Sequence, residues 1–393
     1  MTSSEFSELK PMLEGVEPIT LAEHTSRIEK AQMLMSQHGI DALILESGSG
    51  LEYITGVRWG RSERLLAAIL PISGEPTYVC PAFEEARLRE KLILGDDVRI
   101  WQEHESPYDC IAEILTEHGN QGARLGIEES TRFFVLDGIR SALPSVEMVS
   151  ADPITVSCRG RKSRTEIALI QRAMDTTAEA FKACIARLCA GMSQAEFFEL
   201  SVAAHRAMGV QGHIDVQFGT STAFPHGSSE MTYLKAGDVV LMDGGCRVEG
   251  YCSDISRTIV FGEPTPRQRE IWKLEQDAQA AAFEAATNGS PMENVDAAAR
   301  AILVNAGFGP GYQVPGLPHR TGHGIGLDVH EHYYVVQGNK TPLAPGMCFS
   351  NEPMIAIYGE FGVRLEDCVF MTEEGPRYFT EPSPSIDCPF QTV

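Results

Sequence analysis

The sequence has little positive charge and no long apolar run. Lysine and arginine total 32 against 54 acidic residues, which gives a formal net charge of −22. That balance argues against nucleic acids and anionic membrane surfaces as partners. One of the longest apolar runs, at residues 65–71, is far too short to span a bilayer. The first twenty residues contain neither the basic nor the apolar region of a secretory signal, so we expect no signal peptide.

The chain also lacks any C-x-x-C pair, although it contains ten cysteines. In a chain of this size, scattered cysteines indicate reduced and mostly buried thiols, not a disulfide framework. A zinc finger built on paired thiolates is not indicated either. We therefore expect a cytoplasmic protein.

The length of 393 residues exceeds one ordinary hydrophobic core, so we expect two domains. After residues 1–20, which we expect to form an arm, helical and strand patterns alternate over the first 150 residues or so. The expected helices are 21–38, 82–92 and 109–118, and the expected strands are 41–46, 64–71 and 76–79. Alternation of this kind predicts a small α/β domain.

The domain boundary is predicted near residue 158. Asp152-Pro153 breaks the pattern, and residues 158–164, CRGRKSR, have the composition of a linker. We therefore expect an N-terminal domain at 1–158 and a second domain at 159–393. In the second domain, strand and turn patterns follow two helices and are interrupted by two more, which predicts an α+β fold. The expected helices are 165–189, 193–208 with Ser193 as N-cap, 267–288 and 293–306.

A hairpin at residues 239–261 is the first candidate for chemistry. Two runs rich in Val, Ile, Tyr and Thr flank a turn near residues 248–250. If residues 248 and 249 form the loop, Asp243 lies directly opposite Asp254, and the two carboxylates repel each other. A divalent cation would remove that repulsion, and clustered acidic ligands often hold two. Taken alone, a solvated hairpin with two chance aspartates fits this stretch equally well.

Further candidate ligands are concentrated in short segments rich in glycine and proline. They are His226 in AFPHGSSE, His319, His323 and His330 in LPHRTGHGIGLDVHE, Glu352 in SNEPMI, and Glu366 in GVRLEDCVF. A lone histidine is more often structural, so the joint occurrence carries the argument. Two Asp, two Glu and one His form an oxygen-rich set that suits Mn²⁺, Fe²⁺, Co²⁺ or Zn²⁺. The H-E-x-x-H spacing is absent, and GHGIG lacks the strand–loop–helix context of a nucleotide site.

On these residues the second domain resembles the pita-bread metallopeptidases. With its N-terminal α/β domain, the chain is similar to the prolidase, aminopeptidase P and creatinase branch of that family over roughly residues 20–380. The resemblance implies an α/β N-terminal domain followed by an α+β pita-bread catalytic domain. The five metal positions of the family match in order: Asp243, Asp254, His323, Glu352 and Glu366. Retention of all five argues against a metal-free, creatinase-like enzyme.

The resemblance also implies a role for each matched residue. Two divalent ions, Mn²⁺ first with Co²⁺, Zn²⁺ or Fe²⁺ as alternatives, would share a hydroxide. Asp243 and Glu366 would bridge them, Asp254 would chelate one, and His323 and Glu352 would bind the other. Glu352 would also move a proton toward the leaving nitrogen. His226 and His330 would donate to the developing oxyanion. His319 and Arg364 would either shape the proline-side pocket or support the metal ligands from behind.

The activity that the resemblance implies is hydrolysis of Xaa-Pro dipeptides by a homodimer acting on small peptides. Three alternatives remain open at this point. One is aminopeptidase P-like cleavage of longer Xaa-Pro peptides. Another is non-peptide chemistry, such as hydrolysis of a cyclic amidine, as in an ectoine hydrolase, or lysis of a sulfonium compound. The third is a non-catalytic binding module, which loss of ligands would mark, and no ligand is lost.

Two departures from the prolidase pattern concern the substrate carboxylate. Prolidases usually carry Glu-Pro-Gly where this chain has Glu352-Pro-Met, and an arginine on the following loop, which here is residues 355–362 and contains none. A free carboxylate needs a cation. That cation would have to come from Arg364, from Arg320 or from a partner subunit, for example from its arginine-rich stretch 57–64.

Overall fold

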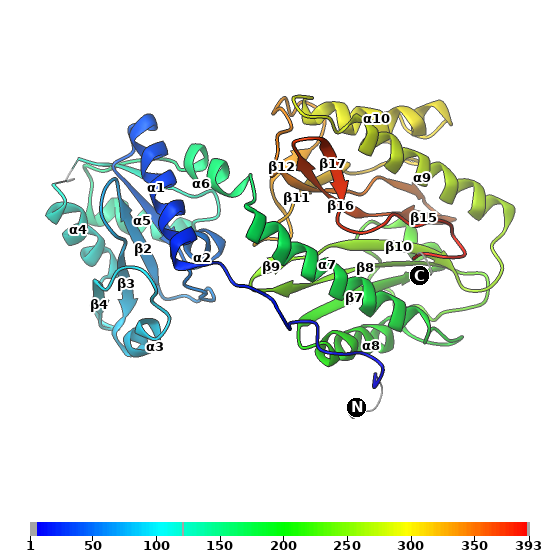
Figure 1. Cartoon of the computed structure of the whole chain (residues 1–393), viewed down its shortest axis with the longest axis horizontal. Helices are drawn as coiled ribbons and strands as arrows, with labels where there is room; N and C mark the ends of the chain where they lie inside the picture. The colour runs from blue at the N-terminus through cyan, green and yellow to red at the C-terminus, as the bar shows by residue number, and fades with distance from the viewer. Residues whose placement is uncertain (1–5, 120–121, 391–393) are drawn as a thin grey trace. The chain divides into compact units, whose positions relative to one another are not determined.

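The computed structural model describes residues 6–119 and 122–390 (Figure 1). The chain divides into two compact units, one formed by residues 19–159 and the other by the N-terminal residues up to 18 together with residues 160 onward. Within the described residues, no helix is both long and apolar enough to cross a membrane.

The unit at residues 19–159 is built on one mixed six-stranded sheet of order β4-β3-β2-β1-β5-β6. Its strands are β1 (Ala42–Glu46), β2 (Ala67–Pro71), β3 (Thr77–Pro81), β4 (Val98–Trp101), β5 (Arg124–Ile127) and β6 (Glu147–Ser150). The central strand β1 pairs antiparallel with β2 and parallel with β5. Every residue of β1 and β2 is buried, because neighbouring strands flank their edges and helices pack against the sheet. The predicted α/β architecture of this domain is confirmed.

Helices surround this sheet: α1 (Leu21–His38), α2 (Ser49–Thr55), α3 (Glu85–Arg89), α4 (Pro107–Glu117), α5 (Phe133–Ala142) and α6 (Asp152–Arg159), with a short 3₁₀ helix η1 (Ala82–Glu84). The predicted helix 21–38 is confirmed, and Thr20 caps it by accepting a hydrogen bond from the Glu23 amide. The predicted break at Asp152-Pro153 is wrong. A helix begins there, because proline in a first turn lacks only an amide that would have no helical partner.

The second unit contains the sheets that carry the candidate ligands. Strand β8 (Val239–Val248) lies between β10 (Ile255–Val260) and β7 (Gln211–Phe218), and β9 (Tyr251–Cys252) also pairs with β8. A five-stranded sheet has the order β12-β11-β13-β16-β17, and β14 pairs with β15. These strands are β11 (Gly322–Gly324), β12 (Glu331–Val335), β13 (Cys348–Asn351), β14 (Met354–Ile357), β15 (Phe361–Arg364), β16 (Asp367–Thr372) and β17 (Gly375–Tyr378). An antiparallel bridge between Ser256 and Glu366 joins the first sheet to the second.

Four helices cover these sheets: α7 (Arg164–Ile185), α8 (Gln194–Ala207), α9 (Pro266–Ala285) and α10 (Met292–Asn305). Helix α7 packs on β8 and α8 packs on β7, while α9 and α10 pack against each other (Figure 1). Ser193 caps α8 in a capping box with Glu196, as predicted, and Ser163 with Glu166 does the same for α7. The predicted α+β architecture is therefore confirmed.

The predicted register of the 239–261 hairpin is wrong by two residues. The turn is Glu249-Gly250, where both residues have positive φ, 47° and 86°. This is the backbone of a type I′ turn, which favours glycine at its second position. Val248 therefore pairs with Tyr251, and Asp243 lies opposite Ser256 instead of Asp254. Since side chains alternate with a period of two, this shift leaves Asp254 on the predicted face, diagonal to Asp243.

The described N-terminal residues up to 18 group with the second unit, whereas the sequence placed residues 1–158 in one domain. The Met12 amide donates to the Met208 carbonyl at 3.0 Å, and Arg172 donates to the Met12 carbonyl at 2.8 Å. Glu8 forms an ion pair of 2.6 Å with Arg187. These contacts tie the segment to α7 and to the end of α8.

A fully buried histidine on α8 makes the stability of this unit depend on pH. The His205 ring donates from Nδ1 to the Ser201 carbonyl at 2.9 Å, and its Nε2 has no partner within the described residues. Burial lowers the pKa of His205 from 6.5 to about 4. Between those values the unfolded chain binds a proton that the folded chain excludes, so stability is lost as pH falls through this window.

We expect His205→Gln to flatten the pH dependence of unfolding. The contribution of His205 reaches on the order of 3 kcal/mol at the acid end of the window. Urea titrations at pH 7, 6 and 5 measure it, with His118→Gln, an exposed histidine, as the matched control. Parallel pH dependences for His205→Gln and the unmutated chain would contradict this account.

Candidate functional site

The five expected ligands converge although they come from different strands and from the residues that directly adjoin strands. Asp243 lies on β8, Asp254 lies between β9 and β10, and His323 lies on β11. Glu352 directly follows β13, and Glu366 lies between β15 and β16. All five line one cavity of about 530 Å³.

Their donor atoms form three overlapping groups in which the atoms lie within 4.8 Å of one another. The groups are Asp243 with Asp254 and Glu366, His323 with Glu352 and Glu366, and Asp254 with His323 and His330. Glu366 belongs to the first and the second group. Two neighbouring cations that share the Glu366 carboxylate could therefore be held here.

The electrostatics of this cluster favour a bound cation. Burial, and after it the negative charges of neighbouring carboxylates, raise the pKa of Asp254 and of Glu366 well above their ordinary values. The Oε1 atom of Glu366 is buried without a hydrogen-bond partner within the described residues. A divalent cation would remove the repulsion and occupy that oxygen, so the residues present fit a metal ion.

His323 is held between two of these carboxylates. Its Nε2 lies 3.0 Å from Glu352 Oε1 and 3.6 Å from Asp254 Oδ2. Burial opposes protonation, yet the two carboxylates raise the pKa of His323 to about 9. The histidine charge in turn lowers the pKa of Glu352 against the effect of burial. A positive charge is therefore favoured at this position, whether a proton or a metal ion supplies it.

Two serines that the sequence analysis missed orient the carboxylates. The Ser256 hydroxyl lies 2.8 Å from Asp243 Oδ1 and 2.7 Å from Glu366 Oε2, so it links two of the candidate ligands. The Ser350 hydroxyl donates to Glu352 Oε1 at 3.0 Å and accepts from the His323 amide at 3.0 Å. The spacing of the two serines could have identified them. Ser256 lies two residues after Asp254 and Ser350 two residues before Glu352, and residues two apart in a strand lie on the same face.

Arg364 is buried beside the cluster and uses all three guanidinium nitrogens. It contacts Asp243 Oδ2 at 2.6 Å, Ser256 Oγ at 3.0 Å and the Pro225 carbonyl at 2.9 Å. This geometry places Arg364 as an orienting group for Asp243. It also ties β15 to the segment that carries His226.

The three expected histidines outside the ligand set, His226, His319 and His330, differ in their position relative to the cavity. His226 and His330 are exposed on the cavity wall, and the His330 ring lies 4.1 Å from the His323 ring between centroids. Partial burial of its ring and the neighbouring positive charges of His323 and Arg320 lower the pKa of His330. His319 is not among the described residues that line the cavity; its Nδ1 donates to the Arg320 carbonyl at 2.6 Å.

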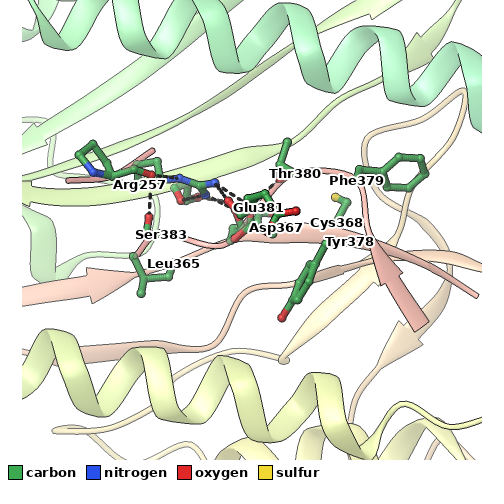
Figure 2. A network of polar contacts seen from close by, with 12 residues as sticks. Arg257, Leu365, Asp367, Cys368, Tyr378, Phe379, Thr380, Glu381 and Ser383 are labelled. Atoms are coloured by element: carbon green, nitrogen blue, oxygen red, sulfur yellow. Dashed lines mark hydrogen bonds and ion pairs between the residues drawn. The ribbon is translucent and has the colours of Figure 1, made fainter. Parts of the chain in front are cut away.

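A fully buried ion pair lies directly behind the cluster (Figure 2). Arg257 and Asp367 are both 0 % exposed and are joined at 2.6 Å. They follow Ser256 and Glu366 in the sequence, where the two sheets meet. Arg257 also donates to the Glu366 carbonyl at 2.8 Å and to the Ser256 carbonyl at 3.0 Å. The arginine thus fixes the backbone on which a candidate ligand is carried.

The C-terminal segment completes this network. Arg257 donates to the carbonyls of Glu381 at 3.2 Å and Pro389 at 3.1 Å. The Thr380 hydroxyl donates to Asp367 at 2.5 Å, as Figure 2 shows. The guanidinium therefore has a partner at each nitrogen, and the segment after β17 closes over it.

Family models match most of the chain. The model for metallopeptidase family M24 matches residues 168–373, and the model for the creatinase/prolidase N-terminal domain matches residues 27–160. A probable dipeptidase PepE of Mycobacterium tuberculosis is 34% identical over 360 residues, covering 90% of this chain and 93% of the relative. An Xaa-Pro dipeptidase of Lactobacillus delbrueckii subsp. lactis is 31% identical over 365 residues, covering 91% and 98%.

Solved structures resemble the chain along both units. A recombinant prolidase from Thermococcus sibiricus has a TM-score of 0.84 at 31% identity, covering 91% of this chain and 97% of that one. The dipeptidase PepE from Mycobacterium ulcerans has a TM-score of 0.85 at 34% identity, covering 93% and 97%. An X-Pro aminopeptidase from Thermotoga maritima has a TM-score of 0.80 at 25% identity, covering 92% and 99%.

The ion pair behind the cluster yields a stability prediction. Asp367→Asn leaves the Arg257 charge buried without its counter-ion, which we expect to lower the free energy of unfolding by about 3–5 kcal/mol. Chemical denaturation measures this loss. The matched control is Asp277→Asn, which breaks the exposed pair with Lys273 and should cost no more than about 1 kcal/mol. Equal, small losses in both variants would contradict the assigned importance of the buried pair.

Proposed function

As a member of metallopeptidase family M24, the chain is a metal-dependent peptidase, and we propose that it hydrolyses the Xaa-Pro bond of dipeptides with two divalent ions bound. The observation that carries the proposal is the pair of donor groups that share Glu366 in one cavity. The names of the relatives, Xaa-Pro dipeptidase and prolidase among them, support the substrate class. We name Mn²⁺ first, with Co²⁺, Zn²⁺ and Fe²⁺ as alternatives that the same ligands would accept.

Five residues would hold the metal ions. Asp243 and Glu366 would be shared by the two ions, as the resemblance implies, and the donor groups support this for Glu366, which belongs to two of them. Asp254 would bind one ion, and His323 with Glu352 the other. When bound, the ions would lower the pKa of a water molecule and supply a nucleophile near neutral pH.

The remaining steps fall to residues of the chain itself. Glu352 would accept the proton of the attacking water and pass it to the prolyl nitrogen, with Ser350 fixing its carboxylate. His330 and His226, both on the cavity wall, would donate to the carbonyl oxygen as its negative charge grows. Arg364 would border the side of the cavity that receives the prolyl ring. His319, which is not among the described residues that line the cavity, would support the neighbouring site residues from behind.

The second candidate function is cleavage of longer Xaa-Pro peptides, which the likeness to an X-Pro aminopeptidase favours. The choice depends on whether a cation receives the free carboxylate of a dipeptide. Arg364 is already engaged at all three nitrogens. We propose Arg320, whose positive charge acts on His330 and whose guanidinium lies 4.2 Å from the Tyr334 ring centroid. The stretch 57–64 of a second copy remains the other source.

We further propose a cytoplasmic homodimer whose catalytic domain begins near residue 159. The absence of disulfides supports a reducing compartment, since all ten cysteines are free and seven are buried. The dimer would allow the arginine-rich stretch of one copy to serve the other. Size-exclusion chromatography with light scattering tests the assembly.

A comparison of two peptides tests the substrate proposal. Purified protein stripped of metal and supplied with Mn²⁺ should cleave Met-Pro faster than Met-Pro-Gly at equal concentration. Arg320→Gln should raise KM for the dipeptide about tenfold, because a charge-assisted bond to the carboxylate is lost, and should leave the tripeptide unchanged. Faster cleavage of the tripeptide by the unmutated chain would favour the second candidate function instead.

Removal of one proposed ligand tests the metal site. Asp254→Asn should lower the metal content per chain and reduce kcat/KM at least about a hundredfold, since a neutral amide is a weak ligand in place of a carboxylate. Elemental analysis after gel filtration measures the metal, and circular dichroism checks the fold. Asp277→Asn is the control of equal charge change. Full metal content together with unchanged turnover in Asp254→Asn would show that the ligand assignment is wrong.

A further inference from the structure

One wall of the cavity is formed by alternate residues of β7. Gln211, His213 and Asp215 lie opposite Arg247, Gly245 and Asp243 of β8 in the antiparallel register, and all six line the cavity. Directly opposed residues share a face of the sheet, so Asp215 projects to the same side as the candidate ligand Asp243. The wall therefore begins beside the proposed metal ions and continues away from them.

Asp215 is an acidic residue of the cavity that the candidate metal groups leave unused. It belongs to none of the three donor groups found within the described residues. Strand β7 lies on the far side of β8 from β10, so Asp215 is one strand farther from Asp254 and Glu366 than Asp243 is. The contact found for its carboxylate is with His213 Nε2 at 3.6 Å, and both side chains are more than half exposed. The carboxylate is thus available to a molecule in the cavity.

The neighbouring position on the same face indicates which part of a substrate passes Asp215. Gln217 is covered, because Gln194 donates to its Oε1 at 2.8 Å and a Cβ on Gly227 would lie 2.1 Å from its Nε2. The covering segment also carries Pro225, whose carbonyl accepts a hydrogen bond of 2.9 Å from Arg364, the residue that we place on the prolyl side. The open part of the wall, at residues 211–215, therefore faces the other half of a dipeptide, the side chain of its first residue.

We propose that Asp215 selects dipeptides whose first residue is basic, Lys-Pro and Arg-Pro. This inference rests on the proposed Xaa-Pro dipeptidase function and names the substrate class within it. A carboxylate on the wall of a cavity attracts a cation more strongly than one on an open surface, because the surrounding protein focuses its field. The long, flexible side chain of lysine or arginine carries its charge several bonds from the scissile carbonyl, which suits a carboxylate one strand away from the reacting group.

The test compares Lys-Pro with Met-Pro, two dipeptides whose first side chains have similar length and differ in charge. The metal-loaded enzyme should prefer Lys-Pro by about fivefold in kcat/KM, the size of a partly exposed ion pair. Asp215→Asn should bring that ratio near unity by raising KM for Lys-Pro alone, because the lost interaction is equal in ground and transition states. Asp277→Asn removes the same charge far from the cavity and should leave the ratio unchanged.

Two further measurements do not depend on turnover alone. Raising ionic strength should weaken the preference of the unmutated enzyme and have little effect on Asp215→Asn. Calorimetry should show that the product lysine binds the unmutated enzyme more tightly than methionine does, and that Asp215→Asn removes the difference.

Three results would overturn the inference. The first is cleavage of both dipeptides by the unmutated enzyme with no preference, which leaves the proposed function standing. The second is an equal loss on both dipeptides in Asp215→Asn, which would mean that Asp215 binds the α-ammonium group common to all substrates. The third is cleavage of neither dipeptide by the metal-loaded enzyme, which would refute the proposed function and this inference with it.

Discussion

The mutual repulsion of four carboxylates is the constraint on which this structure depends. Asp243, Asp254, Glu352 and Glu366 lie on or next to different strands and meet in one partly buried cavity. Without opposite charge, such a cluster cannot remain fully ionised. The protein supplies part of the opposite charge through Arg364 and His323. The buried Oε1 atom of Glu366 has no hydrogen-bond partner within the described residues, which indicates that these two side chains do not compensate the whole cluster. Divalent cations are the chemically natural complement.

The fold holds the carboxylates in place from behind. The two sheets meet where Ser256 pairs with Glu366, and the next residue on each strand enters the buried pair Arg257–Asp367. The same arginine binds carbonyls of the C-terminal segment. A buried pair of this kind contributes little net stability over apolar packing, yet its geometry is specific. The position of the pair next to the cluster indicates that it fixes the backbone beside Glu366.

Local patterns predicted those parts of the molecule that local forces determine. The bounds of α1 match the expected helix 21–38, which ends before Gly39, and Ser193 caps α8 as predicted. The candidate ligand residues were identifiable because histidines and carboxylates cluster in short glycine-rich segments. Period-two alternation placed Asp243 and Asp254 on one face even though the register was wrong.

The parts that could not be predicted depend on tertiary contacts. The register of the hairpin depends on the positive φ of Glu249, and glutamate does not favour that conformation, so the turn could not be placed from the residue types. The pair Arg257–Asp367 joins residues 110 positions apart, and no spacing rule reports such a contact. The wall residue Asp215 became visible only when β7 was found beside β8, since an isolated aspartate in a strand pattern carries no signal of its own.

The central claim is that one cavity holds two divalent ions through five side chains. Anomalous diffraction from crystals grown with Mn²⁺ tests it most directly, because the signal locates the metal independently of the protein atoms. We predict two peaks about 3.5–4 Å apart, with Asp243 and Glu366 contacting both. A single peak, or peaks away from Asp254, His323 and Glu352, would contradict the account.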